Sequence, residues 1–340
     1  MLLTNPFDMH MLVITNSKFK EMSIMQKQDN PPKRHRFGQT LSQHWQMLLM
    51  AIPAIVLLFL FAYMPMFGTV IAFKRYKVKQ GIFGSKWMDP IFRNFEILFR
   101  PGSQALVAIR NTLLLNLMFI VVGTVFAVFL ALMFNELQRQ HYKRIVQSLS
   151  FLPYFISPVV VGIFVQALLG YENGTINALI SSAGGNKINF YANPNMWPAI
   201  LLMTNIWKGA GYSSVVYLAA ITGIDATYYE AARIDGATRW GEIRYITLPL
   251  LTPTVIVMTL LAIGKIMNAD FGFFYNVTGD NPNLYPTTDV LDTFIYRTLR
   301  KTGDMGISSA VGLFQSTCSL ILVLISNFAA RRIDEGSALF

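Results

Sequence analysis

Long uncharged runs are the feature of this sequence that most restricts its fold. A helix needs about 20 apolar residues to cross the hydrocarbon core of a bilayer. Because backbone groups in lipid must be hydrogen-bonded within the spanning structure, runs of this length predict helices, and the alternating pattern of an outer-membrane barrel is absent. The sequence therefore predicts an all-α integral membrane protein with six transmembrane helices. Six stretches contain no Asp, Glu or Arg and at most one lysine, at residues 47–73, 111–134, 145–171, 197–223, 248–268 and 305–330.

Composition excludes several other classes of protein. Only 14% of the residues are charged, against about 25% in soluble globular proteins, and 26 Phe and 14 Tyr are too many for a disordered chain. The net charge of +10 lies between the apolar runs rather than in basic patches, so no nucleic-acid partner is expected. Cys318 is the only cysteine, which excludes an intrachain disulfide and a cysteine-rich zinc site.

The chain also lacks the residues that would give it chemistry of its own. No G-x-x-x-x-G-K-[ST] motif occurs, since Gly264-Lys265 is followed by Ile266, so no ATP site of the P-loop type is expected on this chain. All four histidines lie outside the runs, and no nucleophile or acid–base pair stands at membrane depth. We expect no catalytic residues, no metal site and no bound cofactor.

The runs also suggest how the chain is organised. Residues 1–44 are polar and contain no apolar segment of a signal peptide, so we expect a disordered cytoplasmic tail. A membrane domain is expected at 45–330 and a cytoplasmic C-terminal tail at 331–340. With both termini inside, the cytoplasmic segments hold slightly more Lys and Arg than the outer loops, which favours this orientation weakly.

The segment 225–253, between the fourth and fifth runs, has the pattern of a folded element. Asp225 can cap the start of a short helix, and Gly236 suits the left-handed position that ends it. Thr238 can cap a second short helix before the next span begins. The pair Ala231-Ala232 gives the first helix a small-residue face that can lie close to another protein. We expect two short helices at a membrane surface.

This segment resembles the EAA loop of ABC importer permeases. Glu230-Ala231-Ala232 is followed by Gly236, and then by Ile246, Leu248 and Pro249, at the spacing of that motif. The segment is also similar to the carbohydrate-uptake group (MalF/MalG-type and LplB-like), in which a tyrosine precedes the motif and Ile-Asp-Gly-Ala follows it. The resemblance covers roughly residues 45–330 and includes Tyr63–Lys74, Gly81–Phe99, Leu152–Val161 and Ser214–Ala220.

The resemblance implies a MetI/MalF-like type I ABC importer permease fold and a subunit without enzymatic activity. Such a chain would be a permease subunit of a binding-protein-dependent importer for sugars in the bacterial cytoplasmic membrane. Its expected partners are a second homologous permease (usually a different chain), two cytoplasmic ATPases that hold ATP and Mg, an extracytoplasmic solute-binding protein, the sugar and membrane lipid.

The resemblance also assigns roles within the loop 225–249, which would face the cytoplasm and dock into a cleft on an ATPase. Glu230 would be the polar anchor, Ala231 and Ala232 the close-packing face, and Gly236 the turn. The complete set of expected coupling residues is Glu230, Ala231, Ala232, Asp235, Gly236, Ala237 and Arg239.

Candidates for the substrate path come from the fourth and fifth runs and the loop that follows them. Lys208 is too deep to reach the interface easily, so we expect it to face the bundle interior, whereas Lys265 lies near a helix end and can snorkel. Because sugars bind amide, hydroxyl and aromatic groups, the other candidates are Asn205, Tyr212, Asn268 and Asp270. A basic path would favour an oligosaccharide that carries uronate groups.

Two alternatives remain open at this point. One is a secondary carrier or channel that works alone; the runs contain no Asp or Glu, although proton-coupled carriers usually hold a carboxylate there. The other is an ABC-type sensor subunit that signals without moving a substrate, and the sequence does not separate it from an importer.

Overall fold

The computed structural model describes residues 45–333, and these residues are helical almost throughout. Within that range no strand forms, and one isolated antiparallel bridge joins Lys74 and Trp87. The predicted N-terminal tail lies outside the described residues, as do residues 334–340 of the predicted C-terminal tail. The chain divides between Phe67 and Gly68 into two compact units.

The described part of the first unit is a helix that changes its hydrogen-bonding pattern along its length. A π-helical turn separates two α-helical pieces, and prolines lie at positions 53 and 65. Its elements are α3 (Trp45–Leu58), η1 (Phe59–Tyr63) and α4 (Met64–Met66), followed by the 3₁₀ helix η2 (Phe67–Phe73).

The second unit contains the remaining helices, of which α7, α11 and α18 are the longest. Short 3₁₀ helices fill several connections: η3 (Val78–Gln80), η4 (Arg93–Phe95), η5 (Leu152–Phe155), η6 (Phe190–Ala192), η7 (Pro194–Met196) and η9 (Pro282–Leu284). Two π-helices occur, η8 (Ile243–Thr247) and η10 (Thr298–Thr302). The α-helices are α5 (Gly81–Gly84), α6 (Glu96–Phe99), α7 (Gln104–Glu136), α8 (Gln140–Phe151), α9 (Pro158–Leu169), α10 (Thr175–Ser182), α11 (Trp197–Thr222), α12 (Ala226–Ile234), α13 (Arg239–Glu242), α14 (Leu248–Gly264), α15 (Phe271–Thr278), α16 (Tyr285–Thr288), α17 (Leu291–Arg297) and α18 (Met305–Ile333).

An all-helical membrane fold is confirmed, and four or five of the six predicted spans coincide with helices that are long and apolar enough to cross a membrane. Four helices in the described part are long and apolar enough to cross a membrane, at Leu49–Phe73, Gln104–Glu136, Arg239–Gly264 and Met305–Ala329. A fifth is added if the pair formed by α8–η5 and α9, which bends by 97°, counts as one span. The predicted span at 197–223 is the 26-residue helix α11, whose polar side chains place it outside this group.

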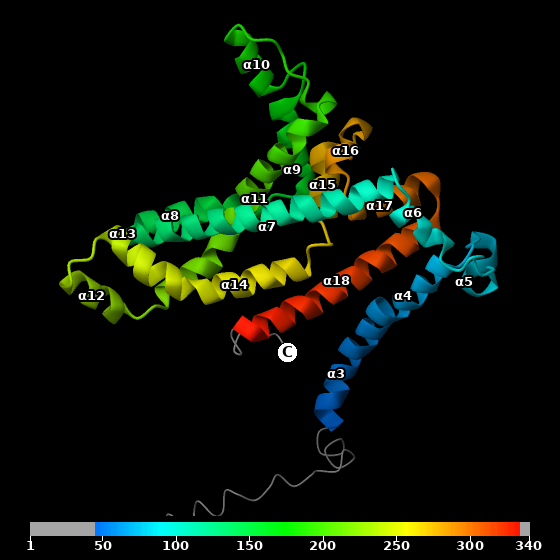
Figure 1. The fold of residues 1–340 in the computed structure, drawn as a ribbon, viewed down its shortest axis with the longest axis horizontal. Coiled ribbons are helices and arrows are strands. Elements are labelled where there is room, and N and C mark those ends of the chain that lie inside the picture. Colours follow the sequence, from blue (N-terminus) through cyan, green and yellow to red (C-terminus); the bar gives the residue numbers. More distant parts are fainter. Residues whose placement is uncertain (1–44, 334–340) are drawn as a thin grey trace, which may run out of the picture. The chain divides into compact units, whose positions relative to one another are not determined.

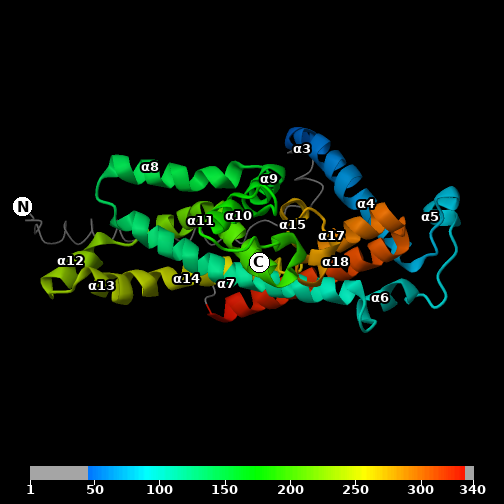
Figure 2. The ribbon, with the colours of Figure 1, turned by 90° about the horizontal axis from the view of Figure 1, so that it is seen from above.

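The helices α7, α11 and α14 lie side by side and form the central layer of the second unit. α11 packs along α7, and α14 packs against α7, α11 and α18 (Figures 1 and 2). Small and aliphatic side chains fill the contact, with Ala127, Ala131, Tyr217 and Leu251 buried in one cluster. Burial of such surfaces holds the layer together through close packing rather than through charge.

The bend between α8–η5 and α9 has a local cause in the sequence. Ser157 accepts a hydrogen bond from the amide of Val160 and so caps the start of α9, while Pro158 occupies its first turn. Both arms of the bend are packed tightly against other helices. A Cβ atom on Gly211 of α11 would lie 2.0 Å from the carbonyl oxygen of Ser150, and one on Gly162 would lie 2.4 Å from that of Asn276.

The segment between α14 and α18 is folded rather than extended. Asn116 of α7 donates hydrogen bonds to the carbonyl oxygens of Ile266 (2.7 Å) and Asn268 (3.2 Å), which ends the helical path of α14 and turns the chain. α15, α16 and α17 follow, and an ion pair between Arg297 and the buried Asp289 lies at the end of α17.

Candidate functional site

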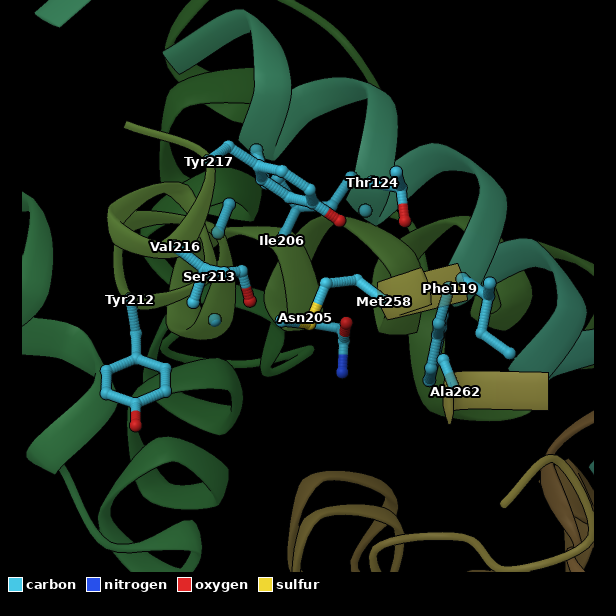
Figure 3. Close-up of a pocket in the computed structure, with 15 residues that line it drawn as sticks. Phe119, Thr124, Asn205, Ile206, Tyr212, Ser213, Val216, Tyr217, Met258 and Ala262 are labelled. Atoms are coloured by element: carbon cyan, nitrogen blue, oxygen red, sulfur yellow. The ribbon is translucent and has the colours of Figure 1, made fainter. Parts of the chain in front are cut away.

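A cavity of about 360 Å³ opens in the central layer, with walls formed by α7, α11 and α14 (Figure 3). Phe119 of α7 and Met258 and Ala262 of α14 supply much of its apolar surface. Among the described residues, no charged side chain lines it. Its polar lining consists of Thr124, Asn205, Tyr212, Ser213 and Tyr217.

The polar side chains that line the cavity differ in whether they already have a partner within the protein. The side chains of Tyr217 and Thr124 interact across the α7–α11 contact. The amide of Asn205 lines the cavity (Figure 3), and no group in residues 45–333 hydrogen-bonds to it. Asn205 therefore offers two donors and an acceptor to a ligand.

Tyr212 connects the cavity lining to the bend between η5 and α9. Its ring stacks on that of Tyr154 with 4.1 Å between centroids and an interplanar angle of 6°. Lys208, one helical turn earlier on α11, donates a hydrogen bond of 3.1 Å to the carbonyl oxygen of Tyr154 and lies 5.3 Å from its ring centre. Lys208 is thus adjacent to the cavity without lining it.

The remaining path candidates lie beyond the end of α14 and outside the cavity lining. Lys265 follows the last residue of α14. Asn268 donates to Ser319 (3.3 Å) and accepts from Gln315 (3.2 Å), both on α18. Asp270 caps α15 by accepting a hydrogen bond of 3.0 Å from the amide of Phe273. The structure therefore brings Asn205 and Tyr212 together in the cavity. Lys265, Asn268 and Asp270 lie outside it, at the start of the segment 265–304.

The loop after α11 has the local structure that its sequence predicts. Asp225 accepts a hydrogen bond of 2.9 Å from the amide of Thr227, which caps α12 and lowers the pKa of the Asp225 carboxyl. Gly236 has φ +80°, in the left-handed region. Thr238 caps α13 by accepting from the amide of Gly241. The predicted helix–turn–helix is confirmed.

The expected coupling residues form the outer surface of this loop. Ala232 is half-buried and the others are exposed: Glu230, Ala231, Asp235, Gly236, Ala237 and Arg239. Two large apolar side chains that the EAA pattern does not include share this surface, since Ile234 is 86% and Trp240 66% exposed. Exposed apolar residues on a short folded loop are typical of a protein–protein contact.

A buried carboxylate lies beneath this surface. Glu242 of α13 is 4% exposed and accepts hydrogen bonds from Arg233 of α12 (Nε to Oε1, 2.8 Å) and from Arg239 (Nη1 to Oε2, 3.4 Å). The Glu242 carboxylate raises the pKa of the Arg233 guanidinium. Glu242 is not among the residues that the sequence singled out, because its partner Arg233 comes from the helix before.

Comparison with known proteins places the chain in a family. Residues 123–335 match the model of the family described as binding-protein-dependent transport system inner membrane component. The polygalacturonan/rhamnogalacturonan transport system permease protein YteP of Bacillus subtilis is 36% identical, over 89% of this chain and 93% of that protein. Protein LplB of Bacillus subtilis is 34% identical, over 86% of this chain and 90% of that protein.

A solved structure agrees with these relatives. The crystal structure of a bacterial ABC transporter involved in the import of the acidic polysaccharide alginate contains a chain that is 35% identical, with a TM-score of 0.79. The match covers 88% of this chain and all of that one. The chain therefore belongs to the family of binding-protein-dependent transport system inner membrane components, as a non-catalytic, multi-pass permease subunit of an ABC importer.

Proposed function

We propose that this chain forms half of the translocation path of an importer for acidic oligosaccharides. The observation that carries the proposal is the similarity, over almost the whole chain, to permeases named for polygalacturonan/rhamnogalacturonan and for alginate. Galacturonan and alginate are polymers of uronic acids, so both substrates carry one carboxylate on most sugar units. The same substrate class is the best choice for this chain.

The cavity has the chemistry of a sugar site. Its volume of about 360 Å³ lies within the usual range for small-molecule pockets, and its lining is mostly apolar with a few convergent polar groups. Asn205 and Ser213 are suited to sugar hydroxyls, and Tyr212 supplies an aromatic face. Lys208 is the one lysine of α11 and lies at the edge of the helix face that lines the cavity. We propose Asn205, Tyr212 and Lys208 as path residues, with Lys265, Asn268 and Asp270 at an outer position.

The loop 225–249 would connect this path to the source of energy. In the proposed assembly two cytoplasmic ATPases carry ATP and Mg, and each permease presents its loop to one of them. Glu230, Ala231 and Gly236 would meet the ATPase together with the exposed Ile234 and Trp240. A second homologous permease completes the path, and an extracytoplasmic binding protein delivers the sugar. Both termini of this chain would then be cytoplasmic.

A pull-down in mild detergent tests the assembly. The wild-type complex should retain an ATPase and a second permease. Glu230→Arg and Gly236→Asp should lose the ATPase and keep the permease, because one reverses the charge on the exposed face and the other strains a left-handed turn. Glu172→Arg is the matched control, since Glu172 is an exposed carboxylate outside the loop, in the connection between α9 and α10. Loss of the ATPase from the control as well, or from none of the variants, would contradict the proposal.

Uptake by proteoliposomes tests the substrate class. With the binding protein and ATPase present, a short oligogalacturonate should be taken up in an ATP-dependent manner, and a neutral oligosaccharide of the same length should not compete with it. Uptake without ATP would instead indicate a stand-alone carrier. ATP hydrolysis that responds to the sugar, with no sugar taken up, would indicate a sensor subunit.

A further inference from the structure

The three helices that form the cavity also converge on the loop 225–249. The cavity is lined by α7, α11 and α14. A second, smaller hollow of about 180 Å³ is lined by Asn135 and Glu136 at the end of α7, by α12, which directly follows α11, and by Ile243 and Thr247, which directly precede α14. Figures 1 and 2 show α12 and α13 at the end of this layer. Any movement of the loop as one body therefore acts on all three cavity walls.

Whether the loop moves as one body depends on how α12 is attached to the base of α14. Along the chain, α12 connects to the continuous helix formed by α13, η8 and α14 (Arg239–Gly264) only through the turn at Asp235–Thr238, and this helix contains the π-helical turn η8 near its start. π-helical turns are rare and are often found at functional sites, where they interrupt the regular ladder of an α-helix. From Thr247, at the end of η8, to Met258 in the cavity wall, the helix rises about 16 Å at 1.5 Å per residue.

Two side-chain contacts bridge this weak connection. Glu242 accepts the two hydrogen bonds from Arg233, at 2.8 and 3.4 Å, and so ties the middle of α12 to α13. The hydroxyl groups of Tyr229 on α12 and Thr247 on η8 lie 3.0 Å apart, and Thr247 also donates to the carbonyl oxygen of Glu242 at 3.3 Å. Of these groups only Glu242 carries a negative charge, and it is buried.

We propose that Glu242 is a positioning residue for energy coupling: through Arg233 it fixes α12 to the base of α14, so that movement imposed on the loop reaches the cavity walls. This inference rests on the proposed role of the loop in docking an ATPase. A charge-assisted pair with two hydrogen bonds to a buried carboxylate is well suited to hold one geometry, although the Arg233 side chain itself is 52% exposed. Arg239 contributes the weaker contact, at 3.4 Å and from an exposed position.

A role in coupling makes a different prediction from a role in folding alone. If the pair only stabilised the loop, weakening it would lower the yield of complex and leave the transport of each intact complex unchanged. If the pair transmits movement, the ATPase still docks and hydrolyses ATP, but less sugar is moved for each ATP. The ratio of sugar transported to ATP hydrolysed is therefore the informative quantity.

The experiment uses the full complex in proteoliposomes, with oligogalacturonate as the sugar. Glu242→Gln preserves shape and removes the charge, and Arg233→Gln removes the charge on the other side and shortens the side chain. Each should co-purify with the ATPase and reduce the sugar-to-ATP ratio about tenfold, which is the scale of one charge-assisted hydrogen bond. Because both changes break the same contact, the double variant should be no worse than either single one. Glu172→Gln, in an exposed pair with Lys187, should match the wild type.

The outcomes separate this inference from the proposed function. A wild-type complex that retains no ATPase would refute the role of the loop itself. A wild-type complex that couples normally, together with a Glu242→Gln complex of unchanged ratio, would overturn only the role of Glu242. Losses that multiply in the double variant would also overturn it, since the two residues would then act separately. Arg233→Lys keeps the charge without the planar fork, and an intermediate ratio in that variant would support the inference if Glu242→Gln fails to assemble.

Discussion

The ammonium group of Lys208 donates a hydrogen bond to the main-chain carbonyl of Tyr154, which joins α11 to the last turn before the 97° bend. The carbonyl end of a helix carries a partial negative charge, so a cation is favoured there. In residues 45–333 no carboxylate pairs with Lys208, so the helix end is its main electrostatic partner. Lys208 therefore stabilises the bend beside the cavity.

Replacing this lysine should loosen the bend. Lys208→Met removes one hydrogen bond from a charged donor, and we expect the midpoint of thermal unfolding in detergent to fall by about 3 °C. Lys208→Arg keeps the charge and should remain close to the wild type. Tryptophan fluorescence during a thermal ramp measures the unfolding midpoint of both variants. An equal fall in the two variants, or none in the methionine variant, would contradict the assigned contact.

The close approach of α11 to α8 gives a second prediction. A Cβ atom on Gly211 would lie 2.0 Å from the carbonyl oxygen of Ser150, so Gly211→Ala must push the two helices apart. Gly209→Ala is the matched control on the same helix, because nothing lies within 4 Å of its Cβ position. The yield of monodisperse protein should drop severely for Gly211→Ala and stay unchanged for Gly209→Ala. Equal yields would show that α8 and α11 are not packed at this point.

The side-chain amide of Asn205 in the cavity gives a third prediction. Asn205→Leu should raise the KM for sugar uptake about tenfold, the equivalent of about 1.4 kcal/mol for one hydrogen bond, without loss of the ATPase from the complex. Met258→Leu changes an apolar wall residue at similar volume and should leave KM nearly unchanged. If uptake by both variants matches the wild type, the cavity is not on the sugar path.

The charged cluster after α15 predicts a contrast between buried and exposed ion pairs. Asp289 is buried, which raises the pKa of its carboxyl, and the Arg297 guanidinium counteracts this by hydrogen-bonding to it (Nη1 to Oδ1, 3.0 Å). Arg297→Met leaves a buried carboxylate without its cationic partner, although Thr293 still donates to it, at a cost of about 3–5 kcal/mol. Lys301→Met removes an exposed partner of Asp280, and exposed ion pairs contribute little to stability.

Thermal unfolding in detergent separates these two cases. Arg297→Met should unfold well below the wild type, and Lys301→Met should unfold close to it. Adding Asp289→Asn to Arg297→Met should recover part of the loss, because the stranded charge disappears. A double variant less stable than Arg297→Met alone would show that Asp289 acts independently of the arginine.

Local signals explain why the loop 225–249 could be predicted residue by residue. Asp225, Gly236 and Thr238 act through their own backbone neighbours, as a cap, a left-handed turn and a second cap, and such roles need no knowledge of the rest of the fold. Hydropathy located the membrane helices for a similar reason, since it depends on composition within one segment.

Features that depend on distant partners could not be predicted in this way. The prolines of the run 145–171 can kink a helix, but hydropathy carries no information on the size or direction of a kink, so the 97° angle could not be predicted. The run 248–268 continues past Gly264 because Ile266 and Met267 are apolar, whereas Asn116, 150 residues away in sequence, binds the carbonyl of Ile266 where the chain leaves the helix. The burial of Glu242 likewise depends on the fold of the whole loop.

Site-directed cross-linking tests the central claim, that the loop 225–249 is the contact with the ATPase. Cys318 is the only cysteine, so Cys318→Ser gives a cysteine-free background. In that background, Glu230→Cys should cross-link to the ATPase in the assembled complex, and Glu172→Cys, in the connection between α9 and α10, should not. Cross-linking at position 230 alone is the result that this account predicts. No cross-link at position 230, in a complex that takes up sugar with ATP, would contradict it.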